Sequence, residues 1–164
     1  MPRILVIDGN VAATRADHVS AGGTDSGEGY AATLKRLAPE VDCDIVRPAD
    51  GEPHRPSGVA LADYAGAVIT GSALNVYSGE AAVERQIELT RAVFAAGVPC
   101  FGSCWGLQVG VVAAGGSVIR NPRGREFGFA RRIQLNPQGR EHPMFLGKPD
   151  VFEAITVHVD TVEH

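Results

Sequence analysis

A cysteine stands between two glycines where an apolar run gives way to a helical pattern. The segment reads Val98-Pro99-Cys100-Phe101-Gly102-Ser103-Cys104-Trp105-Gly106-Leu107-Gln108. Glycines two residues before and two after Cys104 remove the Cβ atoms that would clash in a sharp strand-to-helix turn. Such a nucleophile elbow places the thiol at a helix N-terminus, where the helix dipole and free N–H groups favour a thiolate. The sequence therefore predicts a reactive thiol at Cys104.

The same spacing has a second interpretation. Glycines also mark ordinary strand-to-helix turns, and cysteine is often a small buried apolar residue. The other two cysteines, Cys43 and Cys100, fall in predicted strands, where we expect them to serve packing. Three cysteines fit neither a disulfide framework nor a zinc pattern, and an odd count suits a reducing compartment with one reactive thiol.

Short β-branched runs alternate with longer helical patterns over the first two thirds of the chain. This alternation predicts α/β units around an open, mostly parallel twisted sheet with helices on both faces. The expected strands are residues 3–8, 43–47, 66–70 and 98–102, and the expected helices are residues 27–37, 81–96 and 105–114. After residue 117 we expect strands without intervening helices, at residues 117–120, 131–136 and 152–159.

Two predicted loops meet at the carboxyl ends of the strands, where open parallel sheets bind ligands. One is Gly71-Ser72-Ala73, which follows the third strand, and the other is the elbow. Backbone N–H groups of Gly71 and Trp105 could point into the same space. Two such donors are what an oxyanion hole needs, since attack on a carbonyl leaves negative charge on its oxygen.

Composition excludes several classes of function. The chain has 164 residues, is 45% hydrophobic and 21% charged, and carries a formal net charge of -4. We therefore expect one soluble domain over residues 1–164, with no nucleic-acid partner, because no basic stripe interleaved with aromatics occurs. The apolar run at the N-terminus is too short for a signal peptide, and no run reaches membrane length, so we predict a cytoplasmic location without membrane association.

A glycine-rich stretch at residues 17–29 superficially suggests a phosphate-binding loop. It has neither the Gly-Lys-Ser/Thr ending nor a Gly-x-Gly-x-x-Gly at a strand-helix junction, so no ATP or dinucleotide cofactor is indicated. We interpret it as a flexible surface loop leading into a helix that Asp25 or Ser26 caps. His18, His54 and His142 are interpreted as surface or turn residues.

Several motifs, in order along nearly the whole chain, resemble a class I, or triad-type, glutamine amidotransferase domain of the stand-alone type similar to that of GMP synthase. The motifs are Thr70-Gly71-Ser72, the elbow from Gly102 to Gln108, Gly115-Gly116, Gly124-Arg125-Glu126-Phe127-Gly128, Gly139 with His142-Pro143-Met144-Phe145, and Thr156-Val157-His158-Val159-Asp160. The resemblance implies a flavodoxin-like or Rossmann-like fold.

The resemblance also implies a reaction and roles for residues. Cys104 would attack the side-chain amide of L-glutamine, ammonia would leave, and water would hydrolyse the thioester to glutamate without a cofactor or metal. Gly71 and Trp105 would supply the oxyanion N–H groups. The substrate-binding residues would be Ser72, Gln108, Val157, His158 and Asp160. Gln108 can also be read as a helix residue bonded to nearby backbone, and Glu126 and Gly128 are assigned no chemistry.

The sequence departs from the family pattern at the general base, the histidine that would take the proton of the cysteine. The family supplies histidine and carboxylate as a His-Pro-Glu segment, which this sequence does not contain. One interpretation is that the pattern is cut short at the C-terminus and continues beyond His164. The other is that His158 and Asp160 form the dyad, since residues two apart on a strand face the same side. His164 itself is expected to be mobile and solvated.

Two alternative functions remain at this point. The same thiol chemistry hydrolyses γ-glutamyl peptides, so a γ-glutamyl peptide hydrolase is one alternative. A catalytically inactive module that binds glutamine or a partner synthetase is the other. A synthetase that uses the ammonia would be a separate chain or a missing part of this protein, because no ATP-binding segment is indicated.

Overall fold

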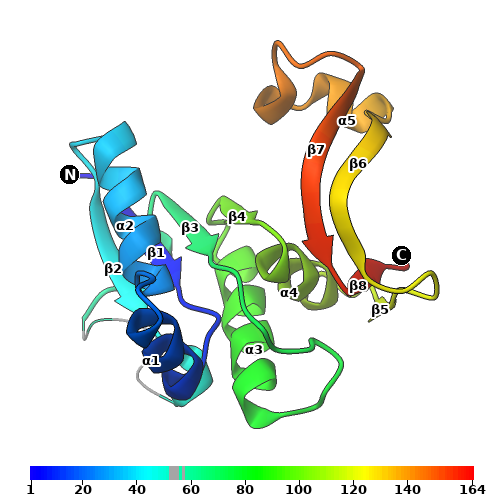
Figure 1. Ribbon diagram of the computed structural model, residues 1–164. Coiled ribbons are helices and arrows are strands. Elements are labelled where there is room, and N and C mark those ends of the chain that lie inside the picture. The colour runs from blue at the N-terminus through cyan, green and yellow to red at the C-terminus, as the bar shows by residue number, and fades with distance from the viewer. Residues whose placement is uncertain (52–55, 57) are drawn as a thin grey trace. The chain divides into compact units, whose positions relative to one another are not determined.

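The computed structural model describes residues 1–51, 56 and 58–164, and the contacts of the chain separate into two compact units (Figure 1). Unit 1 comprises Met1–Ile119 and Val162–His164, and unit 2 comprises Arg120–Thr161. The prediction of one domain over residues 1–164 stays a prediction. His54, interpreted above as a surface residue, lies outside the described residues.

Unit 1 contains a four-stranded parallel sheet. Its strands, in the spatial order β2-β1-β3-β4, are β2 (Asp42–Val46), β1 (Arg3–Ile7), β3 (Gly66–Ile69) and β4 (Cys100–Gly102). All four strands were predicted, and their ends differ by at most two residues from the prediction. The expected open α/β fold with a mostly parallel sheet is confirmed.

Four helices connect or follow these strands. They are α1 (Ala12–Ser20), α2 (Ser26–Leu37), α3 (Ala81–Ala95) and α4 (Trp105–Ala113). Asp25 caps α2, as one of the two predicted caps, by accepting a hydrogen bond from the Glu28 N–H at 3.1 Å. Two short 3-10 helices, η1 (Pro48–Asp50) and η2 (Leu61–Asp63), lie between β2 and β3.

The helix α1 corrects the expectation of a loop over residues 17–29. This helix has no buried residue, so it has no apolar stripe of the kind that reveals a helix in a sequence. Gly22 and Gly23, just beyond its end, gave the segment the composition of a loop. Only the stretch between α1 and α2 remains without helix.

The hydrophobic core lies between the sheet and α3. Leu5 and Ile7 of β1 belong to one buried cluster with Val83 and Ile87 of α3. Because side chains alternate along a strand, the buried Val6 faces the opposite side of the sheet, where α2 packs against β1 and β2. Helices therefore cover both faces, as predicted.

Unit 2 is built on an antiparallel hairpin of β6 (Glu126–Gln134) and β7 (Val151–His158). The expectation of strands without intervening helices is wrong here, because α5 (Pro137–Glu141) and the 3-10 helix η3 (Pro143–Phe145) lie between the two strands. Asn136 caps α5 by accepting a hydrogen bond from the Gly139 N–H at 2.7 Å. The expected strand over residues 131–136 included Asn136, whereas β6 ends at Gln134 and Asn136 is the N-cap of a helix.

One face of the hairpin is apolar and exposed. Phe127 pairs with Val157 and Phe129 with Ile155 across the two strands. Phe127, Phe129 and Ile155 are 77%, 71% and 76% exposed. Two further short strands, β5 (Val118–Arg120) and β8 (Asp160–Val162), pair where the chain passes between the units.

The described helices include none that is both long and apolar enough to cross a membrane.

Candidate active site

The cysteine at the end of β4 has the backbone of a nucleophile elbow. Cys104 is the N-cap of α4, its side chain is exposed, and its φ and ψ angles are 54° and -109°. A positive φ is strained for a residue with a Cβ atom, and such strained residues cluster at active sites and ligand-binding loops. The turn predicted from the glycine spacing is therefore present, with the thiol directed to solvent at a helix N-terminus.

Glycines 102 and 106 are required by close backbone approach. A Cβ atom at Gly102 would lie 2.4 Å from the carbonyl carbon of Gly106. A Cβ atom at Gly106 would lie 2.8 Å from the carbonyl oxygen of Ile69. Both distances are far inside van der Waals contact, so the elbow can close against β3 only with glycine at these positions.

The sheet register brings the two expected oxyanion donors to the same edge. Ile69 of β3 pairs with Gly102 of β4, and Gly71 and Cys104 each stand two residues beyond this pair. Trp105 is the first residue of α4, so its N–H has no acceptor within the helix. Neither this N–H nor that of Gly71 donates a hydrogen bond to another described backbone group.

Two predicted substrate residues also belong to this edge of unit 1. Ser72 is half-buried, and its hydroxyl accepts a hydrogen bond from the Leu74 N–H at 3.2 Å. Gln108 is buried on the first turns of α4, and its backbone N–H bonds to the carbonyl of Cys104 at 3.2 Å. Both residues lie within four positions of a proposed oxyanion donor.

Tyr30 of α2 is a residue of this region that the sequence interpretation missed. Burial raises the pKa of its phenol, and a negative charge at Cys104 raises it further. This electrostatic coupling connects α2 with the elbow although 74 residues separate the two side chains along the chain. No sequence signal pointed to it, because a tyrosine on a helix ordinarily serves packing.

The remaining predicted substrate residues, Val157, His158 and Asp160, belong to unit 2. The premise of a His158 and Asp160 dyad on one strand is not met, because β7 ends at His158 and β8 begins at Asp160. The carboxylate at His158 is instead that of Glu126, whose Oε2 lies 3.4 Å from the Nε2 of His158. Glu126 and His158 are register partners across the hairpin, so the pairing follows from strand alignment.

Glu126 has further polar partners. Its Oε1 accepts a hydrogen bond of 2.9 Å from the Asn121 side chain and lies 3.5 Å from the Arg123 guanidinium. The carboxylate, assigned no chemistry from the sequence, thus joins three side chains of unit 2.

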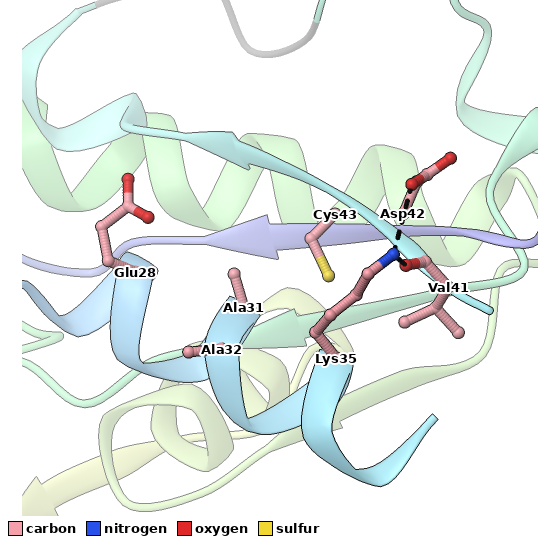
Figure 2. Close-up of a pocket in the computed structure, with 7 residues that line it drawn as sticks. All are labelled: Glu28, Ala31, Ala32, Lys35, Val41, Asp42 and Cys43. Carbon is pink, nitrogen blue, oxygen red and sulfur yellow. Dashed lines mark hydrogen bonds and ion pairs between the residues drawn. The ribbon is translucent and has the colours of Figure 1, made fainter. Parts of the chain in front are cut away.

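The other two cysteines lie in strands, as predicted. Burial raises the pKa of both Cys43 and Cys100, which favours their neutral thiols. Cys43 lines a groove of about 310 Å³ between α2 and β2. Figure 2 shows its side chain among the other residues that line the groove. Lys35 lines this groove, with its ammonium 2.7 Å from the Val41 carbonyl and 3.6 Å from the Asp42 carboxylate.

The remaining described histidines have local roles. His18 is exposed in α1 rather than in a loop, and His142 caps η3 by accepting a hydrogen bond from the Met144 N–H. The backbone of His164, expected to be mobile, accepts at its carbonyl a hydrogen bond of 2.9 Å from the Ser117 N–H. Among the described residues, no group of three or more His, Cys, Asp or Glu side chains could hold a metal ion.

The parallel sheet and the strained, exposed cysteine place this chain in the class of open α/β proteins that carry a nucleophile elbow. The chain belongs to the class-I glutamine amidotransferase family, whose model matches residues 24–164.

Similar proteins support this membership. The chain is 36% identical over 163 residues to a gamma-glutamyl-L-1-hydroxyisopropylamide hydrolase from a Pseudomonas species, covering 98% of this chain and 55% of that protein. This chain thus spans about half the length of that curated relative.

Solved structures share the fold. A glutamine amidotransferase from Thermotoga maritima has a TM-score of 0.70 at 20% identity, covering 99% of this chain and 62% of that one. A putative GMP synthase component from Thermoplasma acidophilum has a TM-score of 0.62 at 20% identity, covering 99% of this chain and 67% of that one.

Proposed function

We propose that this chain carries the nucleophile of a cysteine-dependent hydrolase that cleaves the side-chain amide of L-glutamine. The observation that carries the proposal is the exposed Cys104 at a positive φ of 54° on the N-terminus of α4. Strain of this kind persists only where the surrounding structure enforces it, and it is concentrated at reactive sites. Family membership supplies the substrate class.

The chemistry follows from the elbow. The Cys104 thiolate attacks the amide carbonyl carbon, and the carbonyl electron pair moves to the oxygen. The N–H groups of Gly71 and Trp105 donate to this oxyanion, a contribution of about 3 kcal/mol for one well-placed donor. When the carbonyl re-forms, the carbon–nitrogen bond breaks and the nitrogen leaves as ammonia after gaining a proton. Water then attacks the thioester, which releases glutamate and regenerates the thiol.

Proton transfer to the leaving nitrogen requires a general acid, and a histidine oriented by a carboxylate is the usual device for a cysteine nucleophile. Two sources are compatible with the sequence: the His158 of this chain, whose carboxylate neighbour is Glu126, or a His-Pro-Glu segment outside these 164 residues. Ser72, Gln108, Val157, His158 and Asp160 are the proposed substrate contacts.

A second candidate substrate is an N-substituted γ-glutamyl amide. The 36% identical relative is named as a hydrolase of such a compound, and the same thioester chemistry applies, with an amine leaving in place of ammonia. In an amidotransferase the ammonia would pass to a synthetase, either on a separate chain or on a part of the protein outside these residues. The two candidates differ only in the leaving group, so one assay distinguishes them.

The test measures glutamate release from glutamine and from an N-alkyl γ-glutamyl amide. Both the 164-residue chain and the product of the complete reading frame are assayed. Release from glutamine alone supports the amidotransferase, and release from the N-alkyl amide supports the second candidate. Activity confined to the longer polypeptide assigns the base to the added residues, whereas activity in both assigns it to this chain. Absence of release by either polypeptide contradicts the proposal.

A further inference from the structure

The turn that follows β1 connects the surroundings of both proposed oxyanion donors. It consists of Asp8, Gly9 and Asn10, here called the β1 turn. Asp8 is fully buried and Asn10 is 8% exposed, which is unusual for polar residues without a structural or functional task. No sequence motif identified above includes this turn.

On one side, the β1 turn holds the loop that contains Gly71. The side-chain amide of Asn10 donates a hydrogen bond of 3.2 Å to the Gly71 carbonyl, which also accepts one of 3.0 Å from the Thr70 hydroxyl. That hydroxyl in turn accepts a hydrogen bond of 3.0 Å from the Gly9 N–H. These bonds hold the Thr70 side chain before the Gly71 N–H and the Gly71 carbonyl after it, so they restrict the directions in which this donor can point.

On the other side, the β1 turn holds Trp105. The amide nitrogen of Gln86, a fully buried residue of α3, donates to the Gly9 carbonyl at 3.2 Å. The side-chain oxygen of Gln86 accepts a hydrogen bond of 2.8 Å from the Trp105 indole. The indole also lies directly on the turn, because a Cβ atom at Gly9 would be 2.6 Å from Trp105 Cδ1.

The β1 turn is itself held from both ends. The Asp8 carboxylate accepts a hydrogen bond of 3.0 Å from the Asn10 N–H, and the Arg15 guanidinium donates to the Asn10 carbonyl. Arg15 is paired in turn with Asp50. A turn fixed in this way can hold two loops in a defined position relative to each other, although they are far apart in the sequence.

We propose that Asn10, through the β1 turn, is a positioning residue that sets the direction of the Gly71 N–H relative to the Trp105 N–H. This inference rests on the proposed function, in which these two groups form the oxyanion hole. Asn10 touches no reacting atom in this scheme. Its contribution is preorganisation, since fixed donors stabilise a developing charge without reorganising during the reaction.

Two probes of Cys104 separate this role from a merely structural one. Iodoacetamide alkylates a thiolate by displacement at a methylene carbon and needs no oxyanion hole. A chloromethyl ketone analogue of glutamine presents a carbonyl at the position of the side-chain amide, and its alkylation is assisted where the carbonyl oxygen is stabilised. The ketone is used at saturating concentration, so that differences in its binding do not contribute. The ratio of its inactivation rate to that of iodoacetamide then reports the stabilisation of the carbonyl oxygen.

The variants are Asn10→Asp, which replaces the amide donor by an acceptor of the same shape, and Thr70→Val, which removes the hydroxyl at constant volume. Thr70→Ser keeps the hydroxyl and is the matched control. For Asn10→Asp and Thr70→Val we expect reaction with the ketone to slow by about tenfold or more, because removing a single oxyanion donor costs roughly 10²–10³-fold. We expect iodoacetamide rates within about twofold of the parent in all variants, and Thr70→Ser to match the parent with both reagents.

The outcomes distinguish the positioning role of Asn10 from the proposed hydrolase function on which it rests. If the parent reacts with the ketone at Cys104 and both variants react equally fast, the positioning role is wrong and the proposed function stands. Equal slowing with both reagents would also overturn the inference, since it would indicate general disruption of the elbow. If the parent reacts with iodoacetamide at Cys104 but not with the ketone, the proposed function fails and the inference fails with it.

Discussion

The carbonyl oxygen of Ile69 lies so close to Gly106 that a Cβ atom at that position would be 2.8 Å from it. This contact joins the end of β3 to the first turn of α4. It sets how near the thiol of Cys104 can come to the Gly71 loop, because Cys104 directly precedes α4 and the loop directly follows β3.

The first prediction concerns this contact. Gly106→Ala should destabilise the protein by about 2 kcal/mol, because the new methyl group meets backbone that cannot move aside. Gly110→Ala in the same helix is the matched control: its Cβ would be 3.9 Å from the Phe94 ring, so the gain in helix propensity should stabilise by up to about 1 kcal/mol. Chemical denaturation of both variants measures this. Equal destabilisation would contradict the close approach.

The second prediction concerns backbone strain. Cys104→Gly should be more stable than Cys104→Ala by about 1 kcal/mol or more, because glycine adopts a φ of 54° without the cost that a Cβ atom brings. Both variants should be inactive. Thermal unfolding of the pair is the measurement, and equal melting temperatures would show that the elbow is relaxed.

The third prediction separates the cysteines by activity. Cys104→Ala should abolish glutamate release in the active form of the protein, whereas Cys43→Ala should leave it nearly intact, because Cys43 lies in β2 beside α2. Steady-state kinetics, with circular dichroism to show that both variants fold, is the measurement. Full activity of Cys104→Ala would show that Cys104 is not the nucleophile.

The fourth prediction concerns thiol reactivity. Iodoacetamide near pH 8 should label Cys104 before the other two cysteines, since Cys104 is exposed and burial raises the pKa of Cys43 and Cys100. Alkylation requires the thiolate, which a raised pKa makes scarcer. Peptide mass spectrometry over time measures the order of labelling. Earlier labelling of Cys100 would contradict it.

The fifth prediction concerns Asp8, whose pKa burial raises above its ordinary value of 3.8. Between that value and the raised one, the folded state binds more protons than the unfolded state. The contribution of Asp8 to stability is therefore complete at low pH and is lost as the pH rises through the folded-state pKa. We expect the free energy of unfolding of the parent, relative to Asp8→Asn, to fall as the pH rises from about 4 toward neutrality. A difference that stays constant with pH would contradict this.

The sequence predicted the features that depend on neighbouring residues. The strands of unit 1 follow from β-branched runs, and the elbow follows from glycines two residues on either side of Cys104. Helix α1 was missed because none of its residues is buried, so it leaves no apolar period to recognise. The start of β6 at Glu126 was missed because its apolar side chains alternate toward solvent rather than toward a core.

The links between distant residues could not be predicted. Asn10 and Gly71 are 61 positions apart, and Gly9 and Gln86 are 77 apart. Each partner alone is an ordinary polar or small residue. Only the parallel pairing of β1 with β3, together with the packing of α3, brings them within hydrogen-bond distance.

The exposed face of the β6–β7 hairpin has a consequence for how cooperatively the chain unfolds. The buried cluster that stabilises the fold takes its described members from unit 1, whereas the hairpin directs Phe127, Phe129 and Ile155 to solvent. A two-stranded hairpin with few buried apolar contacts is marginally stable in water. Amide protons of the hairpin should therefore exchange with deuterium through local opening, long before those of β1, which are released only by global unfolding.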